Sequence, residues 1–224
     1  MPPALQLLLC FIIFMLIHIS VMAGCARLFG ITVRSVSYGV GPALLALGKV
    51  KIRLLPLAGS VVLKDTREEE LYDDDPCLDA YNFQPLWKQW LLPLSGVAVL
   101  LALALAILGM QGWDSFMAAF TQIVEGALAP MGTAQELLGK GETFARTHSF
   151  AAVFALFAVK LCAFNLLPFA GLNGGQALLA LLRGGKPYVA WEESVTKWLL
   201  LPGLAIVLAW LAAFGWYGWK AAGA

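Results

Sequence analysis

An apolar stretch with one histidine inside it limits what this chain can fold into. Residues 5–28 (LQLLLCFIIFMLIHISVMAGCARL) contain an unbroken apolar run from Leu7 to Ile17, and His18 follows at once. A helix needs about 20 residues to cross the roughly 30 Å apolar core of a bilayer, so this stretch is long enough to span it. An ionisable side chain at that depth has to be offset by a partner, which makes His18 a candidate site residue.

The composition predicts an integral membrane protein. Hydrophobic residues make up 60% of the chain and charged residues 13%, whereas soluble domains average about 45–50% and 25%. The start Met1-Pro2-Pro3-Ala4 has no basic residue, so the first stretch does not resemble a cleaved signal peptide. The formal net charge of +1 argues against nucleic acid as a partner. The four cysteines form no CxxC pair and no disulfide framework.

The hydropathy pattern predicts an α-helical membrane protein with four transmembrane helices and a small membrane-associated β-sheet between the first two. The expected spans are residues 5–28, 90–108, 150–167 and 198–216, and the expected β-hairpin region is 31–64. An acidic loop follows at 65–79. We expect residues 1–224 to form a single membrane domain, without an inserted PDZ domain.

The basic residues predict an orientation. Most Lys and Arg lie between the first and second spans or between the third and fourth, and few lie elsewhere. By the positive-inside rule those two loops are cytoplasmic and both termini are outside. We expect the chain to lie in a bacterial inner (cytoplasmic) membrane, in contact with membrane lipids.

Three short patterns then point to one family. His18-Ile19-Ser20-Val21-Met22 occupies a helix where a zinc protease would read H-E-x-x-H. Residues 53–61 (RLLPLAGSV) resemble a membrane-associated hairpin that ends in P-x-G-G-Y-V. Residues 165–176 (NLLPFAGLNGGQ) are similar to N-L-L-P-x-P-x-L-D-G-G-H. Together these patterns resemble the site-2 protease family of intramembrane zinc metalloproteases.

The resemblance implies a zinc site whose residues are largely replaced here. The family's two histidine ligands and its aspartate correspond to His18, Met22 and Asn173, and its catalytic glutamate corresponds to Ile19. A catalytic zinc needs three protein ligands and an open position for water, and methionine and a neutral amide are poor ligands for it. Leu100 stands where the family carries an asparagine. We therefore expect no zinc and no hydrolysis.

Other chemistry at these positions stays open. His18, Met22 and Cys25 share one helix face, and soft sulfur ligands would suit Cu(I). The simpler interpretation is that Met22 and Cys25 pack between helices while His18 forms a hydrogen bond with Asn173 or Asn165. Lys160, inside the third span, needs a cavity, a partner or an interface.

Three functions follow from these observations. The first is a non-catalytic member of the family that acts as a binding, scaffold or regulatory subunit for transmembrane partner helices or within a larger membrane complex. The alternative is an active intramembrane zinc metalloprotease with rearranged metal ligands. The third is a small transporter or channel component, motivated by polar residues such as Lys160 and Asn165, although four spans without an inverted repeat disfavour it.

Overall fold

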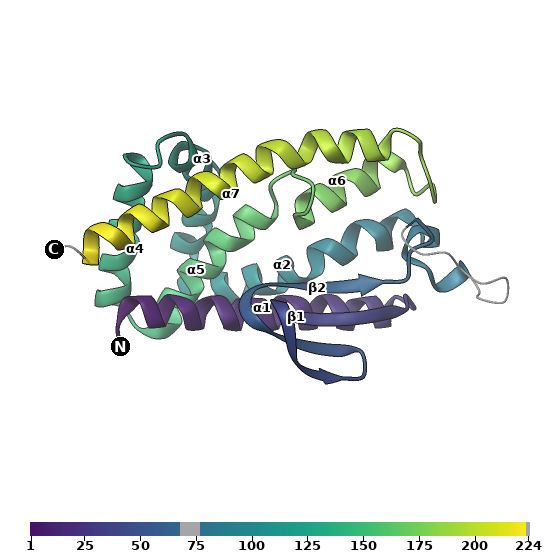
Figure 1. The fold of residues 1–224 in the computed structure, drawn as a ribbon, viewed down its shortest axis with the longest axis horizontal. Coiled ribbons are helices and arrows are strands. Elements are labelled where there is room, and N and C mark those ends of the chain that lie inside the picture. The colour runs from purple at the N-terminus through teal and green to yellow at the C-terminus, as the bar shows by residue number, and fades with distance from the viewer. Residues whose placement is uncertain (68–76, 223–224) are drawn as a thin grey trace.

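A computed structural model describes residues 1–67 and 77–222 of the chain. Several helices run side by side along the long axis of the molecule, and two strands lie next to the first helix (Figure 1). The elements are α1 (Pro3–Leu28), β1 (Val33–Leu47), β2 (Val50–Leu63), η1 (Cys77–Asp79), η2 (Tyr81–Phe83), α2 (Leu86–Leu108), α3 (Met110–Leu128), α4 (Thr133–Thr147), α5 (Phe150–Asn165), α6 (Asn173–Arg183) and α7 (Glu192–Ala222).

Three helices in the described part of the chain are long and apolar enough to cross a membrane, namely α1, α2 and α7. The predicted third span is shorter than expected, because α5 ends at Asn165 after 16 residues, about 24 Å of helix. The Asn165 side chain donates to the Leu161 carbonyl, 2.9 Å away, and a proline follows at 168, where helices usually stop. Membrane-spanning character is thus supported, while the count of four spans is not confirmed.

The small sheet predicted between the first two spans is present. β1 and β2 are antiparallel, and Val33 lies opposite Leu63 while Leu47 lies opposite Val50 across a turn at Gly48. Ile31, Val33 and Val36 are buried against α1, as the alternation of apolar and polar residues predicts. Of the expected acidic loop, residues 68–76 lie outside the described residues. Its two ends carry the ion pairs Lys64–Asp79 and Arg67–Asp65.

The main core lies between α1, α2, α3 and α5. On α5, Ala155, Ala158 and Ala163 are completely buried, and such small residues let neighbouring helices approach closely. Lys160, on the same helix, points to α3: its Nζ donates to the Ser115 carbonyl at 2.9 Å and to Gln122 Oε1 at 2.8 Å. The lysine therefore has polar partners within the fold.

Helix α7 lies along the outside of the bundle (Figure 1). In an apolar 18-residue stretch of α7 only 6% is buried, whereas 28% is buried in the corresponding stretch of α1 and 33% in that of α2. Its C-terminal half is fixed by three hydrogen bonds to the bundle. Trp210 Nε1 donates to the Ile123 carbonyl at 3.0 Å, Gln135 Nε2 donates to the Ala213 carbonyl at 3.0 Å, and Tyr217 Oη donates to Glu142 Oε2 at 2.5 Å. Most of the helix surface is left for lipid or for another protein.

Candidate functional site

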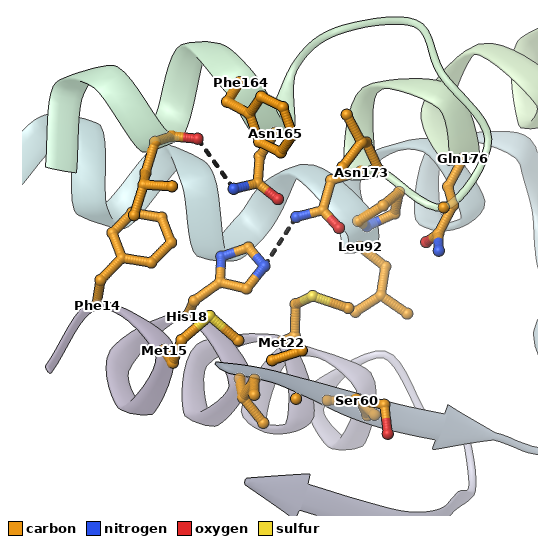
Figure 2. A pocket seen from close by; sticks show the side chains of 18 of the residues that line it. Phe14, Met15, His18, Met22, Ser60, Leu92, Phe164, Asn165, Asn173 and Gln176 are labelled. Atoms are coloured by element: carbon orange, nitrogen blue, oxygen red, sulfur yellow. Dashed lines mark hydrogen bonds between the residues drawn. The ribbon is translucent and has the colours of Figure 1, made fainter. Parts of the chain in front are cut away.

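The candidate site is an open cavity of about 420 Å³ bordered by α1, β2, α5 and the start of α6. Phe14 and Met15 of α1 and Phe164 of α5 form apolar walls, and Leu92 of α2 closes one side. Polar side chains from several elements lie around the same space (Figure 2): Asn165, Asn173 and Gln176 join His18, while the Ser60 hydroxyl points away below β2. The fold therefore brings together residues that lie far apart in the sequence.

His18 and Asn173, the two predicted site positions with polar side chains, bind one another. Asn173 Nδ2 lies 2.8 Å from His18 Nε2, and both residues are buried. With Asn173 donating, the neutral ring of His18 carries its proton on Nδ1. That nitrogen is buried and has no hydrogen-bond partner among the described residues. Of the two partners predicted for His18, Asn173 and Asn165, the structure has Asn173, and the bond uses the ring nitrogen that faces the cavity (Figure 2).

Glycines allow α2 and the sheet to approach α1 at this point. A Cβ on Gly96 of α2 would lie 2.5 Å from His18 Nδ1 and 2.7 Å from the His18 carbonyl oxygen. A Cβ on Gly59 of β2 would collide with the Ile19 side chain, which is 2% exposed. The position matched to the catalytic glutamate is therefore an apolar contact beneath the sheet.

The other residues of the predicted site do not all reach the cavity. Met22 lines the cavity. Cys25 instead packs with the apolar cluster under the sheet, and Leu100 is completely buried in the main core. Ser20 shares a hydrogen bond with Tyr38 Oη at 2.9 Å. The pattern His18, Met22 and Cys25 on one helix face is thus not brought together at the cavity.

The donor set at the cavity does not fit a hydrolytic zinc ion. Across residues 1–67 and 77–222, no group of three His, Cys, Asp or Glu side chains is close enough to hold a metal. His18 is one suitable ligand, but Met22 offers a thioether and Asn173 an uncharged amide that already pairs with the histidine. Zinc sites in proteins use thiolate, imidazole and carboxylate ligands.

A second, larger cavity adjoins the first. It measures about 720 Å³ and shares Val61, Leu63, Tyr81, Gly171 and Gln176 with it. Its far wall consists of the end of α6 and the start of α7. Burial raises the pKa of Tyr81 to about 12, so its phenol remains protonated, and its Oη donates to the Gln89 carbonyl at 2.7 Å.

A partly buried ionic cluster at this wall was not predicted from the sequence. Glu192 Oε1 accepts from Arg183 Nη1 at 2.5 Å and from Arg67 Nη1 at 2.6 Å. Arg183 Nη2 also donates to Gln89 Oε1 at 2.6 Å, and Arg67 pairs with Asp65. Burial works against the charge of Arg67, but the hydrogen bonds and charges of both carboxylates raise its pKa. The sequence feature that could have indicated this cluster is Gln89, a polar residue inside an apolar helix.

Comparison with protein families gives one match. A sequence model described as Peptidase family M50 matches residues 6–210. The matched stretch contains the sheet, η2, α2, α5, α6 and all but the first three residues of α1, and it includes every residue that lines the first cavity. Comparisons with curated proteins and with solved structures find no match.

Proposed function

The chain belongs to peptidase family M50, the site-2 protease family, and we propose that it is a non-catalytic member that binds transmembrane partner helices instead of cutting them. In this proposal the protein serves as a binding, scaffold or regulatory subunit, and it uses no zinc. The family match indicates the fold, and the residues of the cavity are the reason why we propose that proteolysis is lost.

One observation carries the proposal. Two of the three positions matched to zinc ligands, His18 and Asn173, form a hydrogen bond with each other at 2.8 Å. The third, Met22, offers a soft and uncharged sulfur. The position of the general base, Ile19, is packed against β2. Activation of water therefore lacks both the metal, which would lower the pKa of the water, and the carboxylate that would take its proton.

Binding is the use that remains for such a cavity. Its walls are apolar with a few polar groups, which is typical of sites that recognise a ligand rather than merely pack. The long exposed surface of α7 lies near the second cavity, since Glu192, Thr196 and Lys197 line that cavity. A transmembrane helix of another protein is a partner of suitable length and polarity for this surface.

We also infer that α5 is a fourth membrane crossing. The start of α1 and the end of α7 lie at the same end of the molecule (Figure 1), which requires an even number of passes. α5 packs against both α1 and α2, and its 16 residues suffice where the surrounding protein shields its ends from lipid. In the orientation predicted by the basic residues, both termini are outside.

The test is a combined binding and cleavage assay in proteoliposomes. The purified protein is mixed with fluorescent transmembrane peptides, energy transfer reports binding, and mass spectrometry reports the peptide products. We expect bound and intact peptides, with the same result for His18→Ala. A cleavage product that is lost in His18→Ala would contradict the proposal and favour an active protease with rearranged ligands. Absence of binding to any peptide would contradict the binding role.

A further inference from the structure

We propose that the cavity beside His18 recognises a carboxamide, the side chain of an Asn or Gln residue, on the partner transmembrane helix. The inference rests on the proposed function and names the chemistry by which a partner is selected. It follows from three properties of the cavity: the lack of charge in its walls, the unpaired amide atoms, and the depth at which they lie.

The walls of the cavity offer hydrogen bonds without charge. Among the described residues that line it there is no Asp, Glu, Lys or Arg. A charged partner group would therefore be buried without a counter-charge, which is strongly unfavourable. A purely apolar partner would leave the amides facing it unpaired, which is also unfavourable in a membrane. A neutral polar group avoids both costs.

The amides that line the cavity have free donors and acceptors. Asn173 is 8% exposed. Its Nδ2 forms the hydrogen bond with His18, while its Oδ1 has no hydrogen-bond partner among the described residues. The exposed Gln176 side chain likewise has no hydrogen-bond partner among the described residues, either at its amide oxygen or at its amide nitrogen. Figure 2 shows that the Asn173 oxygen and the Gln176 amide turn towards the same space. A carboxamide has both donor and acceptor, so one such group can pair with both.

The position of these amides sets the depth of the partner residue. His18 lies ten residues before the end of α1 at Leu28, which corresponds to about 15 Å along the helix. The cavity of about 420 Å³ accepts side chains, while the body of the partner helix stays outside. We therefore expect the recognised Asn or Gln to lie about ten residues from the same membrane face, by the same helical rise.

The experiment uses the whole chain in proteoliposomes and a matched set of synthetic helices. Each peptide is a Leu/Ala transmembrane helix flanked by lysines, with Asn, Gln, Leu or Asp at the tenth position, and energy transfer gives its affinity. Interhelical hydrogen bonds in membranes predict about 3- to 15-fold tighter binding of the Asn and Gln peptides than of the Leu peptide. This preference should disappear in Asn173→Leu and in Gln176→Leu, and remain in Thr121→Val, whose side chain lies on α3 outside the cavity.

The outcomes separate this inference from the function on which it rests. Equal affinity for the Asn and Leu peptides would overturn the selection of carboxamides but leave partner binding intact. Tighter binding of the Asp peptide would also overturn it, because the cavity would then prefer charge. No binding of any peptide would overturn both. Because Asn173 is buried, its variant has a risk of misfolding, and the exposed Gln176 provides the independent test.

Discussion

Replacement of Glu192 by glutamine tests whether the ionic cluster fixes the start of α7. The Glu192 carboxylate accepts hydrogen bonds from Arg183 at 2.5 Å and from Arg67 at 2.6 Å. The side chain of Arg183 is only 2% exposed. In Glu192→Gln both arginines lose the charge that they share, and Arg183 is too deeply buried to regain water.

The expected loss can be estimated from these contacts. Removal of one partner of a buried ion pair costs about 3–5 kcal/mol. Arg183 keeps its hydrogen bond to Gln89 and Arg67 keeps Asp65, so we expect the lower limit, about 3 kcal/mol. For a chain of this size 1 kcal/mol shifts the unfolding midpoint by about 2–4 °C. Glu192→Gln should therefore lower the midpoint by roughly 6–12 °C.

The assay is thermal unfolding in detergent micelles, followed by tryptophan fluorescence. Glu193→Gln is the matched control, because Glu193 is the next residue and its pair with Lys197 is fully on the surface, with side-chain exposures of 79% and 72%. We expect no measurable shift for the control. The double variant Glu192→Leu with Arg183→Met should recover part of the loss, since it leaves no buried charge unpaired. Equal midpoints for Glu192→Gln and Glu193→Gln would refute the reasoning.

Two further predictions concern the site and the sheet. Gly96→Ala should destabilise the protein by about 1–3 kcal/mol, because its Cβ would press on His18. Gly24→Ala, with no atom within 4 Å of the new Cβ, should stabilise it by about 0.5–1 kcal/mol. Similar unfolding midpoints for the two variants would contradict the close packing of α2 against His18. Burial works to raise the pKa of Asp79, but the hydrogen bond from Lys64 helps to lower it overall. The Lys64–Asp79 pair therefore stabilises the fold above about pH 4, and this stabilisation is lost as the pH falls further. Unfolding midpoints between pH 3 and pH 7 should depend less on pH in Asp79→Asn, and an unchanged dependence would contradict this role.

The sequence was sufficient to predict the sheet and the polar pair at the centre of the site. Alternating apolar residues in 31–64 identify strands because one face has to be buried. A histidine inside an apolar helix requires a partner, and the sequence offered two, Asn173 and Asn165. The structure selects Asn173, whereas the Asn165 side chain donates to its own helix.

Other features could not be predicted because they depend on tertiary contacts. The end of α5 at Asn165 is a local feature, two residues before the predicted end of the span, and hydropathy averages do not resolve a difference of that size. The cluster of Arg67, Arg183 and Glu192 joins segments more than 100 residues apart, and surface ion pairs are the ordinary interpretation of such residues in a sequence. The open amide of Gln176 became visible only once the cavity was known.

The metal content of the purified protein tests the central claim most directly. The protein is incubated with excess zinc, dialysed, and measured by plasma mass spectrometry, with His18→Ala as the negative control and Met22→His combined with Asn173→Asp as the positive one. We predict far less than one zinc ion per chain in the natural sequence, equal to that in His18→Ala, and about one in the double variant, which restores three ligands of the usual kind. One zinc ion per chain in the natural sequence, lost in His18→Ala, would contradict the account.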